Sequence, residues 1–201
     1  MVMPKKVDPI ERRKLFAEAA ISVIAEKGLE NLRLVDIARE AGLTTGSLTH
    51  YFNDKDQVVA AALDHVIETA LAQANSTEDG LIPALLAFLP LDRDGHAAAR
   101  VWLAFFSQSI GRPSLSCMHR QYYEEFVEAL VRILSSIPAL KSHTPDALTT
   151  TANLLIALVD GILVRATLDP QGWPPARQVQ HLTWGVNALT NTTTHLEVSA
   201  Q

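Results

Sequence analysis

The stretch LVDIAREAGLTTGSLTHYF, residues 34–52, decides the fold of this chain. Leu34, Ile37 and Ala38 give a first short helix an apolar face, and the small Ala38 lets a second helix approach closely. Gly42 can adopt the left-handed conformation that ends this helix and turns the chain. The pattern predicts two short helices joined by a tight turn, which is a helix-turn-helix.

The second short helix presents a polar surface. Thr44 or Thr45 can cap its first turn, Leu48 faces the interior, and Phe52 anchors the far end. The positions left facing outward are small or polar: Thr45, Gly46, Ser47, Thr49 and His50. Side chains of this kind suit a helix that enters the major groove of DNA.

Helical periodicity continues on both sides of this unit. Upstream it predicts a helix over about residues 9–27 that stops at Gly28. Downstream, paired apolar residues at four-residue intervals predict a helix over about residues 54–73, with Asp54 and Gln57 as a capping pair. Further helices are expected at about residues 81–89, 95–110, 114–136, 144–168 and 175–189. No segment alternates like a strand, so the predicted fold is all-α, with about nine helices.

The net charge of −5 is unevenly distributed. Residues 1–56 carry nine basic and nine acidic side chains, whereas residues 57–201 carry eight basic and thirteen acidic ones. Within the first 14 residues, five basic side chains accompany two acidic ones. A neutral segment with a basic start can approach phosphates more readily than the acidic remainder. We therefore expect two domains, a helix-turn-helix DNA-binding head over residues 1–56 and a helical body over residues 57–201.

Composition and motifs exclude several other classes of protein. A chain that is 48% apolar and 19% charged is typical of a folded globular protein. A single cysteine, Cys117, excludes an internal disulfide and a cysteine-rich zinc module. We find no phosphate loop, no nucleophile–base arrangement and no paired catalytic carboxylates, so we expect no catalytic residue, no metal and no cofactor. With no apolar signal region and no uncharged membrane-length run, the chain is expected to be cytoplasmic and to contact no membrane.

The helix-turn-helix resembles that of the tetracycline-repressor (TetR) family of bacterial transcription regulators. The matching words are Asp36-Ile37-Ala38, Ala41-Gly42-Leu43-Thr44, Gly46, and His50-Tyr51-Phe52 with Lys55 three residues on. The resemblance extends over about residues 9–69, with the motif itself at about residues 33–52. It implies a three-helix head that binds double-stranded operator DNA.

Carried over position by position, the resemblance implies nine DNA-contacting residues: Arg33, Thr44, Thr45, Gly46, Ser47, Thr49, His50, Tyr51 and Lys55. The positions from Thr44 to Thr49 would face base edges or adjacent phosphates. His50 and Tyr51 would donate to phosphate oxygens, and Lys55 would neutralise a phosphate.

Several of these roles have alternatives. Arg33 stands where the family usually has a Thr or Ser cap, and Thr49 stands where Tyr is frequent. Packing explains Tyr51 as well as phosphate contact does, and a solvated surface position explains Lys14. Basic residues near the N-terminus are expected to add contacts: Lys5, Lys6, Arg12, Arg13 and Lys14.

The body resembles the C-terminal domain of the choline-responsive BetI-type branch of the family, on residues 101–106 (VWLAFF) and 157–166 (ALVDGILVRA). We expect an effector cavity lined by Trp102, Phe105, Phe106, Tyr122 and Tyr123, with Asp160 as a counter-charge. Such a cavity suits a cationic or apolar small molecule. The alternatives are core packing for each aromatic residue and a pairing with Arg165 or a partner subunit for Asp160. Gly161 is expected to permit close helix packing.

The helix expected over residues 144–168 is apolar nearly all round, which predicts burial on more than one side. One side would face the body core, and the other would join the last helix in a four-helix interface with a second subunit. The alternative is a buried core helix in a monomer.

Together, these features predict a homodimeric repressor that binds a palindromic operator and is released by a small-molecule effector. The alternatives are an activator, a regulator controlled by a protein partner and, in a different class, a small helical enzyme.

Overall fold

The computed structural model describes residues 8–76 and 80–191, and the described residues form helices without strands. The α-helices are α1 (Pro9–Lys27), α2 (Leu34–Glu40), α3 (Thr45–Tyr51), α4 (Lys55–Ser76), α5 (Leu81–Leu86), α6 (Arg93–Ser109), α7 (Pro113–Ser136), α8 (Pro145–Leu168) and α9 (Pro175–Asn191). A short 3-10 helix, Pro138–Leu140, follows α7. The all-α prediction is confirmed, and each predicted helix is present with ends shifted by a few residues.

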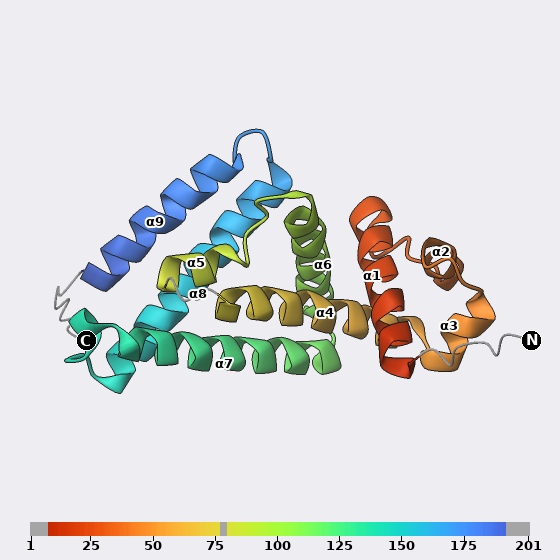
Figure 1. The fold of residues 1–201 in the computed structure, drawn as a ribbon, viewed down its shortest axis with the longest axis horizontal. Coiled ribbons are helices and arrows are strands. Elements are labelled where there is room, and N and C mark those ends of the chain that lie inside the picture. Colours follow the sequence, from red (N-terminus) through yellow and green to blue (C-terminus); the bar gives the residue numbers. More distant parts are fainter. Residues whose placement is uncertain (1–7, 77–79, 192–201) are drawn as a thin grey trace, which may run out of the picture.

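The head, drawn in red and orange at one end of Figure 1, consists of α1, α2, α3 and the start of α4. Glycines with positive φ end two of its segments, Gly28 at 77° after α1 and Gly42 at 66° in the turn before α3. Thr44, and not Thr45, caps α3, because its hydroxyl accepts a hydrogen bond of 3.1 Å from the Ser47 amide.

The start of α4 carries the predicted capping pair. The Gln57 amide donates to Asp54 Oδ1 at 2.8 Å, and the Gln57 side-chain oxygen accepts from the Asn53 amide at 3.1 Å. Two otherwise unpaired backbone donors are thus satisfied where the chain turns from α3 into α4. This exchange fixes the direction in which α4 leaves the head.

The core of the head is built around Phe16, Ile37, Leu48 and Phe52, each with no exposed surface. Leu48 lies on the inner side of α3, as predicted, so the opposite side of that helix is left for solvent or DNA. One further member of this core, Val101, belongs to α6 of the body and is 1% exposed.

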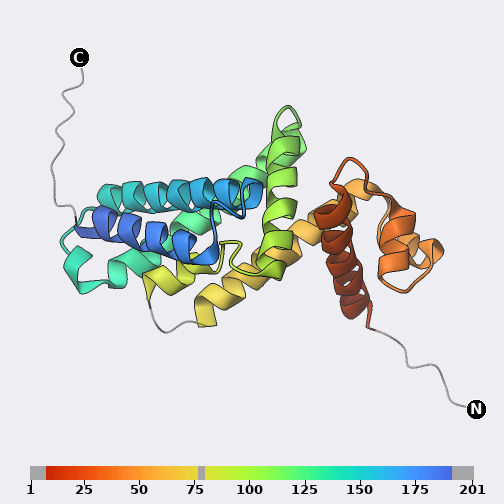
Figure 2. The ribbon, with the colours of Figure 1, turned by 90° about the horizontal axis from the view of Figure 1, so that it is seen from above.

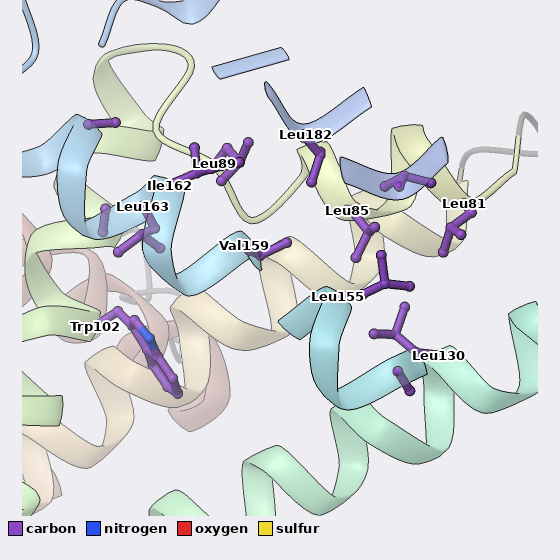
Figure 3. Close-up of a cluster of buried hydrophobic side chains, with 14 of the residues drawn as sticks. Leu81, Leu85, Leu89, Trp102, Leu130, Leu155, Val159, Ile162, Leu163 and Leu182 are labelled. Atoms are coloured by element: carbon purple, nitrogen blue, oxygen red, sulfur yellow. The ribbon is translucent and has the colours of Figure 1, made fainter. Parts of the chain in front are cut away.

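The body contains α5 to α9 and the second half of α4, and α8 runs through it (Figures 1 and 2). Figure 3 shows Leu85 of α5, Leu130 of α7 and Leu155 of α8 converging in its core. Six residues of α8 that recur at intervals of four and three are all buried: Leu148, Ala152, Leu155, Val159, Ile162 and Ala166.

By length and composition alone, α8 could also cross a membrane. A core helix of a folded protein passes the same test, and α8 packs against α6, α7 and α9. We therefore interpret α8 as the central helix of the body.

Two helices join the head to the body. α4 places Val58 and Ala62 in the head core and Leu63 and Ile67 in the body core. α6 packs against α1, and Arg100 Nη1 donates a hydrogen bond of 2.5 Å to the Ala25 carbonyl near the end of α1. Because both helices contribute to both parts, the domain boundary between residues 56 and 57 stays a prediction.

Candidate DNA-binding surface and effector cavity

The outer side of α3 is the candidate DNA-reading surface. Thr45, Gly46, Thr49 and His50 are exposed on it, and Ser47 is half-buried. The Thr49 hydroxyl donates to the Gly46 carbonyl at 3.2 Å, and its oxygen remains able to accept a hydrogen bond. These side chains are short, so the helix backbone can come close to base edges. Their DNA contacts stay predictions.

Arg13 of α1 contacts the end of α3. Its guanidinium lies 4.4 Å from the centroid of the Phe52 ring, and Nη1 donates to the Tyr51 carbonyl at 2.7 Å. The Tyr51 ring is half-buried and packs against Phe16 at 6.1 Å and His50 at 5.2 Å between ring centroids. Arg13, expected to add a DNA contact, thus holds α3 in place, and Tyr51 has a clear packing role.

The other basic residues of the head differ in their freedom to meet a phosphate. Arg33 is exposed and makes no side-chain capping hydrogen bond at the start of α2. Lys55 is partly buried, and its Nζ donates to the Leu29 carbonyl at 2.8 Å. Lys14 forms an exposed ion pair with Glu18 at 3.9 Å. Lys5 and Lys6 lie outside the described residues.

A cavity of about 120 Å³ lies between α4, α5, α6, α7 and α8. Three of the six predicted ligand residues line it: Trp102, Tyr123 and Asp160. Two further aromatic rings, Phe88 and Phe126, also line it and were not among the predicted ligand residues. Phe126 lies three residues after Tyr123 on the same face of α7, so helical spacing was a usable signal. Phe88 follows the short α5, where the sequence held no such signal.

Asp160 is the one charged side chain among the described residues that line this cavity. Tyr123 Oη donates to Asp160 Oδ2 at 2.6 Å, and the Trp102 ring stacks on the Tyr123 ring with centroids 5.9 Å apart. Burial raises the pKa of Asp160 above its ordinary value, against the opposing effects of the Tyr123 hydrogen bond, of nearby His119 and of Trp102. Burial also raises the pKa of the Tyr123 hydroxyl. The phenol therefore stays a donor to the carboxylate.

His119, which was not among the predicted ligand residues, packs against this group. Its ring stacks on Tyr123 with centroids 4.4 Å apart and lies 6.2 Å from Trp102. Burial lowers the pKa of His119, while the charge of Asp160 acts in the opposite direction. His119 is thus a titratable group behind the aromatic wall.

The remaining three predicted ligand residues lie outside the lining, because helix rotation turns them elsewhere. Phe105 is 1% exposed in the body core and meets Tyr122 at 6.4 Å between ring centroids. The Tyr122 hydroxyl donates to Asp64 of α4. Phe106 is 40% exposed and packs against His119. The expectation that all five aromatics share one wall is corrected to two of them.

Two interactions considered for α8 are not found within the subunit. Arg165 does not pair with Asp160, because its guanidinium lies over the Trp173 ring, 4.4 Å from the centroid. A Cβ atom on Gly161 would meet no atom within 4 Å, so this glycine permits no close packing within the subunit. Gly185 of α9 has that role, since a Cβ there would lie 2.5 Å from Leu158 Cδ2.

The outer side of α8 and α9 carries exposed apolar side chains. Leu154 is 49% exposed, and Leu168 and Trp184 are each 76% exposed. Gly161 is exposed on the same helix, midway between the two leucines. Large exposed apolar side chains on adjacent helices are typical of an interaction surface.

Two family models match separate parts of the chain. A family model described as bacterial regulatory proteins of the tetR family matches residues 16–62. A second, described as the C-terminal part of BetI-type transcriptional repressors, matches residues 77–191. The transcriptional regulator PksA of Bacillus subtilis is 30% identical over 175 residues, which cover 84% of each chain. The regulator BetI of Vibrio parahaemolyticus is 31% identical over 183 residues, covering 85% of this chain and 87% of BetI.

Solved structures give the same result for the fold. A transcriptional regulator from Rhodococcus has a TM-score of 0.78 and 29% identity, covering 89% of this chain and 96% of its own. A regulator from Saccharomonospora viridis, solved in complex with choline, has a TM-score of 0.74 and 21% identity over the same shares of the two chains.

Proposed function

The chain belongs to the tetR family of bacterial regulatory proteins and carries a BetI-type C-terminal domain, and we propose that this DNA-binding transcriptional regulator is an effector-released repressor. Like the other members of this family, it is a transcriptional regulator and not an enzyme. We place its action in the cytoplasm, where operator DNA is found. The main support for this proposal is that two adjacent residues of α6 belong to different parts of the molecule. Val101 lies in the head core, and Trp102 lines the cavity.

For operator binding, the polar side of α3 would lie in the major groove. Thr45, Gly46 and Thr49 are the exposed residues nearest the start and middle of that helix, where base edges are usually read. Thr44, Ser47, His50 and Tyr51 would contact flanking phosphates or bases, together with Arg33 and Lys55. A hydrogen bond to the Leu29 carbonyl leaves Lys55 Nζ two further donors for a phosphate.

A homodimer would form through the outer sides of α8 and α9. Leu154, Leu168 and Trp184 would be buried against the partner, and the bare surface at Gly161 would let the two α8 helices approach closely. Two heads related by a two-fold axis would then bind half-sites about 34–36 Å apart, or a multiple of that distance, on a palindromic operator.

Release of the operator would follow from ligand-induced movement of α6 and α4. Arg100 and Val101 hold α1 of the head, and the next residue, Trp102, lines the cavity together with Asp160. A ligand that displaces Trp102 would therefore shift the α6 segment on which α1 rests. The choline complex of the Saccharomonospora regulator supports a small-molecule effector in this body. The effector must bind more tightly to the state that does not fit the operator.

The test is equilibrium binding to labelled duplexes tiled across the DNA upstream of this gene and its neighbours. The parent protein is compared with the double variant Thr45→Ala/Thr49→Ala and with Thr149→Ala, an exposed threonine of α8, as the control. The double variant should lose at least about tenfold in affinity for the best duplex, since each good base contact discriminates by about 1–3 kcal/mol. Equal affinity of all three proteins, or no duplex bound at low salt, contradicts the proposal.

A further inference from the structure

The cavity is chemically different at its two ends. Trp102, Tyr123 and Asp160 form the polar end, where the Tyr123 hydroxyl already donates to the Asp160 carboxylate. The rest of the described lining is aliphatic or aromatic, with Leu71, Leu85, Leu130 and Ile133 among its larger members. In Figure 3, Trp102 lies on one side, Leu85 and Leu130 lie on the other, and Val159 lies between them.

We propose that the effector of this cavity is an amphiphilic monocation, with a compact ammonium head against Asp160 and a short alkyl chain among the leucines. This inference rests on the proposed function for its regulatory meaning, but the ligand class follows from the lining alone. With an apolar lining around the tail, a ligand with a polar tail, such as choline, is not expected to be the best-fitting molecule.

The charge of Asp160 and the aromatic rings near it determine which head group the cavity can bind. One carboxylate without a cationic lining residue beside it favours a single positive charge, because a buried charge is stable only when paired. The rings of Trp102, Tyr123 and Phe126, whose centroids lie 5.9–6.3 Å apart, present aromatic faces or edges around that position. A methylated ammonium, with its charge spread over methyl groups, suits such a wall better than a strongly hydrated one.

The tail is determined by the lack of polar partners. In the described lining outside the Asp160 group, no side chain can donate to or accept from a hydroxyl, so a hydroxyl placed there loses its hydrogen bonds to water. An alkyl chain instead gains by burial, by about fourfold in affinity for each methylene. A volume of about 120 Å³ limits the chain to a few carbons, since an engineered cavity of about 150 Å³ holds a benzene-sized molecule.

The experiment is calorimetric titration of the full-length protein, without DNA, with tetramethylammonium, propyltrimethylammonium and choline. The last two differ only in a terminal methyl or hydroxyl group. Propyltrimethylammonium should bind about tenfold or more tightly than tetramethylammonium, and about tenfold more tightly than choline. The uncharged isostere of choline, 3,3-dimethylbutan-1-ol, should bind more weakly than choline, because it has the same shape and hydroxyl but lacks the charge. Choline binding as tightly as its propyl analogue, or affinity independent of chain length, overturns the proposal.

Two variants locate the ends of the ligand. Asp160→Asn should reduce the affinity for propyltrimethylammonium by at least about tenfold, whereas Glu124→Gln, which removes an exposed charge from α7, should leave it unchanged. Ala129→Leu fills the apolar part of the lining, so it should remove the advantage of the propyl chain and preserve tetramethylammonium binding. Unchanged affinities in Asp160→Asn overturn the assignment of the head group. Since no DNA is present, these outcomes are independent of operator binding.

Discussion

For Lys55, the sequence predicts one interaction and the structure shows another. Its position after the recognition helix, taken with the family motif, predicts a phosphate contact. The structure adds that its ammonium group bonds to the Leu29 carbonyl, which joins α4 to the loop after α1. Such a contact between residues 26 positions apart leaves no periodic signal in the sequence, so no sequence pattern reveals it.

The two roles of Lys55 can be separated by salt. If its ammonium contacts a phosphate, Lys55→Ala should reduce the slope of log affinity against log salt by about 1.8, because the dimer releases two fewer counterions, one for each subunit. Lys141→Ala, an exposed change in the body, is the control. Fluorescence anisotropy on the best duplex at several salt concentrations measures the slope. A weaker complex with an unchanged slope would mean that Lys55 acts only by holding the Leu29 loop.

Because the Asp160 carboxylate can be protonated, effector binding is expected to depend on pH. A cation stabilises the ionised carboxylate, so its binding lowers the pKa of Asp160, which burial raises in the free protein. Below the pKa of free Asp160, affinity for the cation should therefore decrease as the pH falls, by up to about tenfold per pH unit. Above that pKa, the affinity should be constant. The groups facing it are Tyr123 and His119 of α7 and Trp102 of α6. Protonation of His119 would add a competing cation and act in the same direction.

Calorimetry with propyltrimethylammonium from about pH 5 to pH 8 measures this dependence, with His119→Gln separating the two groups. In Asp160→Asn the contribution of the carboxylate should vanish. Binding that strengthens as the pH falls would contradict the assigned sign.

At the scale of elements, helical periodicity and capping residues located the helices well, since both signals are local. The sequence placed Gly28, Gly42 and Thr144 at helix ends, and each is found there. The rotation of one helix against another was less predictable, because it depends on packing between distant segments. This is why Phe105 and Tyr122 turn away from the cavity while Phe88, from a loop after α5, enters its wall.

α6 is expected to couple the effector cavity to the head. Arg100→Ala removes its hydrogen bond to the Ala25 carbonyl but leaves both the cavity lining and α3 intact. Ligand affinity and operator affinity measured separately should change little, whereas the factor by which the ligand weakens operator binding should fall at least about threefold. Arg93→Ala, at the exposed start of α6, is the control. An unchanged factor in Arg100→Ala would exclude this contact as a route between the two sites.

At the scale of the whole molecule, the asymmetry of charge has a structural counterpart. The neutral head lies at one end and the acidic body at the other, with α8 and α9 side by side within the body (Figures 1 and 2). Sequence periodicity predicted an α8 buried on more than one side. It could not identify the outward residues, because those depend on how α9 packs on α8 at Gly185 and Leu158.

The dimer predicts that Trp184 is buried in the assembled protein. Trp184→Asp places a charge where the partner would lie, and should convert the dimer to a monomer by sedimentation equilibrium. The thermal stability of the subunit should change little, since the side chain is 76% exposed within it. Gln180→Asp, another exposed change on α9, is the matched control. A Trp184→Asp protein that remains dimeric would move the interface away from this surface.

The central claim is that two copies of this chain bind a two-fold symmetric operator through their α3 helices. A hydroxyl-radical footprint of the full-length protein on its own upstream DNA tests this most directly. We predict protection of two equivalent half-sites related by a dyad, with centres about 34–36 Å or a multiple of that distance apart. Protection should disappear when saturating propyltrimethylammonium is added. A footprint without a dyad, or no protection at low salt, would rule out this mode of operator binding.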